Sequence, residues 1–203
     1  MRASTRRELI AGPAGKIECA VDEPENSFSR GVALVAHPHP LHGGTLDNKV
    51  AQTLARAFVE LGYTAWRPNF RGVGASEGTH DEGRGELDDL AAVLACARGD
   101  KPVLAGFSFG AAVQARLAQR LAQEGKAPSR MVLVGLAVAH LEVPPVPADT
   151  IVIHGAEDTT VPLADVLAWA RPQDLPVVVV PGADHFFHRR LHVLRAIVQN
   201  GWK

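Results

Sequence analysis

The sequence has only two cysteines, no apolar run long enough to cross a membrane, and no excess of charge of either sign. Cys19 and Cys96 form no C-x-x-C motif, so we expect no disulfide framework and no redox motif. The 21 Lys and Arg against 22 Asp and Glu give a formal net charge of −1, which offers no basic surface for nucleic acid. A membrane span needs about 18 consecutive apolar residues, and none is expected here. Residues 1–8 are basic but lack the apolar segment of a signal peptide, so we expect a cytoplasmic protein.

What the sequence does contain is a regular alternation of short apolar segments with longer amphipathic ones. This alternation predicts a mainly parallel, twisted sheet with helices on both faces. A Gly-Pro-Ala-Gly turn within residues 7–21 predicts an antiparallel edge. Either Asp47 or Asn48 is expected to cap the first helix. We therefore expect one three-layer α/β/α domain over residues 1–203. The expected strands are residues 31–37, 63–67, 102–107, 131–138, 150–154 and 177–180, and the expected helices are residues 47–61, 86–98, 109–124, 161–170 and 188–200.

A G-x-S-x-G motif provides the candidate nucleophile. It reads Gly106-Phe107-Ser108-Phe109-Gly110 and lies between an expected strand and an expected helix, the context in which this motif forms a nucleophile elbow. The sharp turn strains the serine backbone and leaves no room for side chains at the two glycines. It also places the serine oxygen at a helix N-terminus, which favours negative charge. The alternative is a glycine-rich turn with an incidental serine, and the strand–turn–helix context favours the nucleophile.

A nucleophilic serine needs a base and an acid that orients the base. In this type of fold the order along the chain is Ser, acid, His, each after a strand. Asp158 follows the expected strand at 150–154, and His185 follows the one at 177–180. Glu157 is a competing acid and His188 a rival base. Asp158 is otherwise interpreted as a helix cap and His185 as a surface histidine.

The oxyanion hole requires two backbone N–H groups. One is expected from Phe109, directly after the nucleophile, and the other from the loop after the strand at 31–37. Pro38 and Pro40 in that loop have no N–H. The donor is then His39, Leu41 or a later residue, and we prefer Leu41 over His39.

Three histidines in the same loop raise the question of a metal. His37, His39 and His42 are close in sequence, but no second cluster offers further ligands, so we expect no metal. We interpret His37 and His42 as polar lining of the pocket. Arg71 and Ser76, in the loop after the next strand, are further lining candidates, and a solvated glycine-rich turn is the equal alternative for them.

Two longer motifs carry a family resemblance. HPHPLHGGTLDNKV at residues 37–50 and NFRGVGASEG at residues 69–78 resemble the small, lidless, dienelactone-hydrolase-like family of bacterial α/β hydrolases. The resemblance runs from about residue 30 to the last residue. It implies an α/β-hydrolase fold, a serine hydrolase acting on esters or thioesters, and catalytic roles for Ser108, Asp158 and His185. Dienelactone hydrolases proper use a cysteine nucleophile, so their own activity is not implied.

The connection at residues 139–149 sharpens the expected function. These residues include three prolines and are too few to form a cap domain, so we expect an open, shallow site for short acyl groups and varied leaving groups. The expected reaction is hydrolysis of small-molecule carboxylic esters through an acyl-enzyme, without a cofactor, by a monomer or homodimer. A thioesterase, a small peptidase and a non-catalytic binding protein on the same fold stay open as alternatives. A dehydrogenase is disfavoured, because the first parallel strand is not followed by G-x-G-x-x-G.

Overall fold

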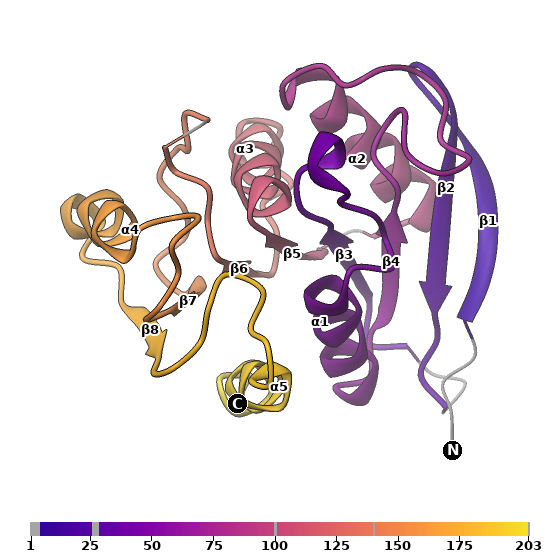
Figure 1. Ribbon diagram of the computed structural model, residues 1–203. Coiled ribbons are helices and arrows are strands. Elements are labelled where there is room, and N and C mark those ends of the chain that lie inside the picture. Colours follow the sequence, from indigo (N-terminus) through magenta and orange to yellow (C-terminus); the bar gives the residue numbers. More distant parts are fainter. Residues whose placement is uncertain (1–4, 26–28, 100, 140, 203) are drawn as a thin grey trace.

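A computed structural model describes residues 5–25, 29–99, 101–139 and 141–202 (Figure 1). Residues 1–4, part of the basic N-terminal stretch, and residue 140 in the proline-rich connection lie outside the described residues. Within the described ranges, eight strands form one sheet in the order β1-β2-β4-β3-β5-β6-β7-β8. The strands are β1 (Thr5–Gly12), β2 (Gly15–Asp22), β3 (Val32–Ala36), β4 (Thr64–Pro68), β5 (Val103–Phe107), β6 (Arg130–Val134), β7 (Ile151–Gly155) and β8 (Val177–Val180).

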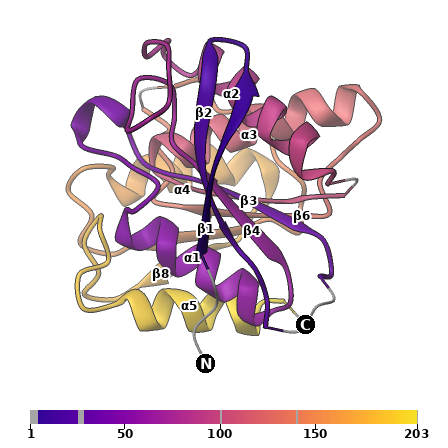
Figure 2. The same cartoon turned by 90° about the vertical axis from the view of Figure 1, so that its right-hand side faces the viewer.

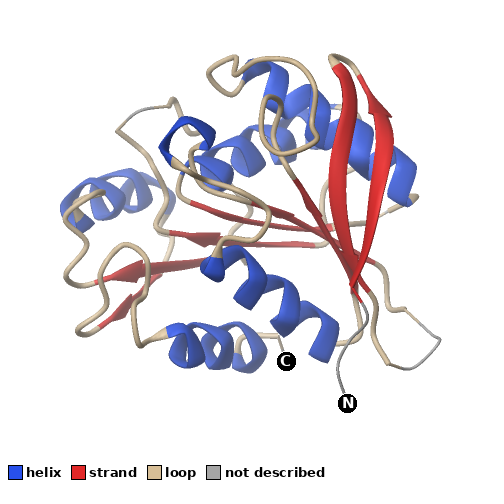
Figure 3. Ribbon diagram, turned by 45° about the vertical axis from the view of Figure 1, so that its right-hand side comes forward, coloured by secondary structure: helices blue, strands red, loops and turns tan. Residues whose placement is uncertain are grey.

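The sheet is parallel from β4 to β8 and antiparallel at its first edge. β1 pairs antiparallel with β2, and β2 pairs antiparallel with β4, whereas the other neighbours run parallel. Figure 3 shows the two long strands of the β1–β2 hairpin at this edge. The expected parallel sheet with an antiparallel N-terminal edge is therefore confirmed.

Helices cover both faces of the sheet and give three layers. α1 (Lys49–Glu60) and α5 (Leu191–Asn200) pack together on one face, as Figure 2 shows. α2 (Arg84–Ala97), α3 (Phe109–Gln123) and α4 (Leu163–Ala170) lie on the other. Two short 3-10 helices, η1 (Pro40–His42) and η2 (Arg171–Gln173), complete the order. None of the described helices is long and apolar enough to cross a membrane.

The central strands are buried on both faces, which accounts for their continuous apolar sequence. Successive side chains of β3 alternate between the two cores: Leu34 packs with the α2–α3 side, and Val35 packs with the α1–α5 side. At the start of α1, the Asn48 side-chain oxygen accepts hydrogen bonds from the N–H groups of Val50 and Ala51. Asn48, rather than Asp47, is therefore the cap.

Two expected element boundaries are wrong, each because of residues with positive φ. The strand expected over 131–138 ends at Val134, since Gly135 has φ 52° and the chain leaves the sheet there. The helix expected from residue 188 begins at Leu191. Phe187 and Arg189 have φ of 54° and 58°, which a right-handed helix does not accommodate. In the connection from β6 to β7, the described residues 135–139 and 141–150 contain neither helix nor strand.

Candidate active site

Ser108 occupies a tight turn between β5 and α3, as the motif predicts. Its backbone lies at φ 55° and ψ −117°, a conformation that costs a non-glycine residue free energy. The turn requires glycine on either side. A Cβ atom on Gly106 would lie 2.6 Å from the backbone nitrogen of Ala111, and one on Gly110 would lie 2.4 Å from the carbonyl oxygen of His37. The serine therefore stands at the N-terminus of α3, directly beside the end of β3.

His185 lies between Ser108 and Asp158, in the loop from β8 to α5. Its Nε2 is 3.1 Å from Ser108 Oγ, and its Nδ1 is 2.6 Å from Asp158 Oδ2. All three side chains are buried. An ionised carboxylate only accepts hydrogen bonds, so Nδ1–H donates to Asp158 and Nε2 is the acceptor for the serine hydroxyl. Three residues from three different strand ends thus form one continuous hydrogen-bonded chain.

The Asp158 carboxylate is held in its ionised form by its neighbours. Its Oδ1 accepts hydrogen bonds from the N–H groups of Thr160 at 2.9 Å and Val161 at 2.8 Å. Burial raises the pKa of this carboxyl, but the hydrogen bonds from His185 and from the Val161 N–H outweigh burial and lower the pKa below its ordinary value. Asp158 therefore stabilises the turn before α4 and the imidazole of His185 at once.

The two rival residues lie elsewhere. Glu157 is exposed, whereas its neighbour Asp158 is buried against His185. His188 is also exposed, and its Nδ1 contacts Asp184 Oδ2 at 2.6 Å. The structure therefore joins Ser108 to Asp158 through His185 and not through either rival.

His37 is a buried, neutral histidine between the ends of β3 and β4. Its Nε2 accepts a hydrogen bond from the Phe70 N–H at 3.0 Å, and its Nδ1–H donates to the Pro38 carbonyl at 2.7 Å. Burial lowers the pKa of His37 to about 4, although the contact with Pro38 works in the opposite direction. The His37 ring is thus held by hydrogen bonds inside the loop and does not face solvent.

The two candidate oxyanion donors differ in their contacts. The Leu41 N–H donates to His39 Nδ1 at 3.3 Å, and Leu41 is 69% exposed. The His39 ring packs against the Phe109 ring, with centroids 4.9 Å apart, and stacks on His42 at 4.5 Å. The Leu41 N–H is therefore engaged within the loop, whereas His39 lies against the residue that follows Ser108.

Arg71 and Ser76 support the loop at residues 69–78. Arg71 donates two hydrogen bonds of 2.8 Å to the carboxylate of Asp89. Ser76 Oγ donates to the Asn69 carbonyl and accepts from the Glu18 N–H. Both polar groups are thus engaged within the protein. Among the described residues, no three His, Cys, Asp or Glu side chains are grouped so that they could hold a metal ion.

Sequence reasoning missed three buried residues near the site. His154, on β7, has Nε2 at 2.9 Å from the Val161 carbonyl and 3.4 Å from Asp158 Oδ2. Arg67 and Asn69, at the end of β4, contact the loop that follows β3. A polar residue at a strand end in a buried segment was the available signal for all three.

Comparisons with known proteins agree with this geometry. Residues 41–142 match the model of a family described as the alpha/beta hydrolase family. An uncharacterised protein of Rickettsia prowazekii is 32% identical over 192 residues, which cover 87% of this chain and 79% of that protein. The crystal structure of an α/β serine hydrolase without a lid from Xanthomonas campestris is 38% identical, with a TM-score of 0.87, covering 99% of this chain and 94% of that one.

A further solved structure, of an α/β serine hydrolase homologue from Coxiella burnetii, is 35% identical with a TM-score of 0.85 and covers 100% of both chains. The matches extend over the sheet, both helical layers and all three strand ends around Ser108. This chain belongs to the α/β hydrolase family, and its fold is that of the serine hydrolases that lack a lid.

Proposed function

We propose that the protein hydrolyses small-molecule carboxylic esters, with Ser108 as nucleophile, His185 as general base and Asp158 as the group that orients the base. One observation carries the proposal: the unbroken hydrogen-bonded chain from Asp158 through His185 to Ser108 Oγ. An unaided serine hydroxyl is a weak nucleophile, and a histidine within hydrogen-bond reach is the standard means of activating it. A protein that only binds its ligand would need neither this hydrogen-bonded chain nor a strained backbone at the serine.

The reaction proceeds in two halves. As Ser108 Oγ attacks the carbonyl carbon, its proton moves to His185 Nε2, and the carbonyl electron pair moves onto oxygen. Collapse of this tetrahedral species expels the alkoxide, which takes the proton from His185 and leaves an acyl-serine. Water then gives a proton to His185 and attacks the acyl carbon, and Ser108 recovers the proton as the carboxylic acid departs. Asp158 stabilises the positive charge on His185 in both halves.

For the oxyanion we assign the backbone N–H groups of Phe109 and His39. The first N–H groups of a helix have no partner inside the helix, so the Phe109 N–H at the start of α3 is directed at the turn. His39 is favoured over Leu41 for two reasons: the Leu41 N–H points to His39 Nδ1, and the His39 ring lies against Phe109. The Pro38 carbonyl points toward the His37 ring, and in a trans peptide the following N–H points the opposite way.

We base the proposed substrate class on the connection from β6 to β7, where larger hydrolases could carry a cap. The β6–β7 connection lacks regular structure in its described part, and the related Xanthomonas campestris hydrolase is itself described as having no lid. We therefore propose short acyl groups and tolerance of varied alcohols. A thioester or a peptide presents the same carbonyl to Ser108, so the leaving group is the property that assays must decide.

The test is covalent labelling together with turnover. A fluorophosphonate should form one adduct, located on Ser108 by peptide mass spectrometry, and p-nitrophenyl acetate and butyrate should be hydrolysed faster than the decanoate. Acyl thioesters and p-nitroanilides of the same chain length rank the leaving groups. The Ser108→Ala variant should give neither adduct nor turnover. A folded wild-type sample that takes up no label would contradict the proposal.

A further inference from the structure

The loop that supplies the proposed His39 donor is fastened at both ends by residues at the C-terminal end of β4. We propose that Arg67 and Asn69 are positioning residues for the acylation step, which act through Leu46 on the Pro38–His39 peptide and are themselves held by the β1–β2 hairpin. This inference rests on the function proposed above, because it assigns the support of one oxyanion donor.

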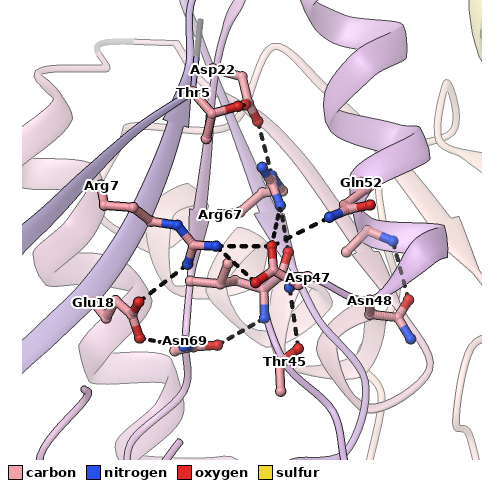
Figure 4. Close-up of polar contacts among 12 residues, drawn as sticks. Thr5, Arg7, Glu18, Asp22, Thr45, Asp47, Asn48, Gln52, Arg67 and Asn69 are labelled. Carbon is pink, nitrogen blue, oxygen red and sulfur yellow. Dashed lines mark hydrogen bonds and ion pairs between the residues drawn. The ribbon is translucent and has the colours of Figure 1, made fainter. Parts of the chain in front are cut away.

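The first step is the grip on Leu46, which lies where the loop joins α1. Both backbone polar groups of this buried residue are taken by side chains at the end of β4, those of Arg67 and Asn69, which Figure 4 labels. The Leu46 N–H donates to Asn69 Oδ1 at 2.8 Å, and the Leu46 carbonyl accepts from an Arg67 Nη at 2.5 Å. One residue of the loop is thus fixed from two directions by two rigid partners.

The second step is what holds those partners. Arg67 and Asn69 are each only 4% exposed. Arg67 Nε donates to Asp22 on β2 at 2.9 Å, and Asn69 Nδ2 donates to Glu18 on the same strand at 2.7 Å. A buried polar group left without its partner is destabilising, and more so if it is charged, so each side chain has one strongly preferred position. The β1–β2 hairpin, through Asp22 and Glu18, is therefore the frame that supports the loop.

A surface ion pair on the same frame reaches the loop directly. Arg7 on β1 donates to both oxygens of Asp47, at 3.0 and 2.7 Å, and to Glu18 at 3.2 Å. Figure 4 shows Arg7 and Arg67 approaching Asp47 from different strands. Because Arg7 is about half exposed, this contact is the weaker part of the frame.

The third step connects Leu46 to the donor. Two residues before it, the Gly44 N–H donates to the His39 carbonyl at 3.0 Å. Gly44 packs so closely that a Cβ atom there would lie 2.1 Å from the Pro38 carbonyl oxygen. The His37 ring, held by the Phe70 N–H, contacts that same oxygen through its Nδ1 at 2.7 Å. The Pro38–His39 peptide is thereby confined between two parts of the loop, both anchored at residues 67–70.

A donor displaced by a fraction of an ångström binds the ground state nearly as well but the oxyanion much less well. The Asn69→Ala variant should therefore lose about 10- to 100-fold in kcat/KM per titrated active site, with KM within about threefold of wild type. An alkylboronic acid, whose hydroxyl occupies the oxyanion position, should bind more weakly by the same factor. A merely structural defect would raise the unfolded fraction of the sample. Active-site titration with a fluorophosphonate corrects kcat/KM for that fraction.

Two further variants calibrate the effect. Arg7→Gln removes the exposed contacts of Arg7 with Asp47 and Glu18, keeps the protein folded, and should give the same pattern at about two- to fivefold. Arg6→Gln is the matched control: Arg6 lies on the same strand but pairs with Glu8 and Glu23 on the surface, so kcat/KM and boronic-acid affinity should stay at the wild-type value.

Hydrogen–deuterium exchange of the same variants separates this inference from the proposed function. In Asn69→Ala, amides in residues 39–46 should exchange faster while those of β5 and α3 keep their protection. Wild-type kcat/KM and boronic-acid affinity in Asn69→Ala and Arg7→Gln would overturn the inference and leave the esterase proposal standing. If the wild type itself neither labels nor turns over, the esterase proposal fails, and unchanged exchange in residues 39–46 would then overturn the support by Asn69 as well.

Discussion

The carbonyl oxygen of His37 lies 2.4 Å from the point where a Cβ atom on Gly110 would stand. This close approach brings the N-terminus of α3 against the end of β3. In Gly110→Ala, either the helix or the loop must move, and we expect a loss of about 3 kcal/mol or more in the free energy of unfolding. Urea denaturation of the wild type and the variant measures this loss.

Gly125→Ala is the control for that substitution. Gly125 follows α3 at φ 73°, with nothing within 4 Å of the methyl group that alanine would add, so only the backbone preference is lost. About 1 kcal/mol is expected. Equal losses in the two variants would show that the contact with His37 is not tight.

Ser108→Gly should stabilise the protein while removing the proposed nucleophile. Glycine adopts the φ of 55° without strain, whereas alanine keeps the strain of serine. We expect Ser108→Gly to unfold at a Tm about 2–4 °C above that of Ser108→Ala, measured by circular dichroism. Both variants lack the hydroxyl, so their difference isolates the backbone. A lower Tm for the glycine variant would argue against a strained turn.

Asp158→Asn should lower kcat by about 10⁴-fold. The remaining carbonyl oxygen keeps the N–H groups of Thr160 and Val161, which turns the new amide toward His185 Nδ1. Nδ1 must then accept a hydrogen bond, so the imidazole proton moves to Nε2. A protonated Nε2 cannot receive the proton of Ser108. Steady-state kinetics on p-nitrophenyl acetate test this. Glu157→Gln serves as the control and should be as active as wild type.

Acid should destabilise the fold through His37. Its pKa falls from the ordinary 6.5 to about 4 in the folded protein, because burial disfavours the charged ring. Between these values the unfolded chain binds a proton that the folded chain does not. The contribution of His37 to the free energy of unfolding is therefore fully present above pH 6.5. It declines as the pH falls toward 4, by at most roughly 1.4 kcal/mol per pH unit.

The His37→Asn variant provides the comparison. Its free energy of unfolding, measured by urea denaturation at several pH values, should fall less steeply than that of wild type between pH 6.5 and about 4. Parallel curves for the two proteins over this interval would mean that His37 titrates normally in the fold.

The architecture was within reach of the sequence because it follows from periodicity. Buried parallel strands leave continuous apolar runs, and their carboxyl ends share one edge, so the candidates Ser108, Asp158 and His185 were expected to meet there. Their convergence is a property of the sheet. Their catalytic roles stay predictions until turnover is measured.

Contacts inside loops were beyond that reasoning. The preference for Leu41 as oxyanion donor rested on excluding prolines, yet the orientation of this N–H depends on the side chain of His39 two residues earlier. Positive φ at Phe187 and Arg189 is likewise imposed by the surrounding fold, since the intrinsic preference of neither residue favours it.

The contacts of the frame that supports the loop could not be predicted from the sequence for a different reason. Glu18 and Asn69 are 51 positions apart, and Arg67 and Asp22 are 45 apart. In the sequence, each residue alone is an ordinary polar side chain in or beside a strand. Only the antiparallel pairing of β2 with β4, which fixes the register of the two strands, brings the partners together.

The wide spacing of Ser108 and His185 along the chain has a consequence for biosynthesis. Their hydrogen bond spans 77 positions, and the base lies beyond the last strand of the sheet. Under the proposed mechanism, a nascent chain that has emerged only as far as Ser108 still lacks the proposed base, so we expect it to be inactive until the ribosome has delivered β8 and the loop after it. The proposed esterase activity, followed in a translation reaction, would then report the completion of the sheet, with a lag set by the slowest long-range pairing.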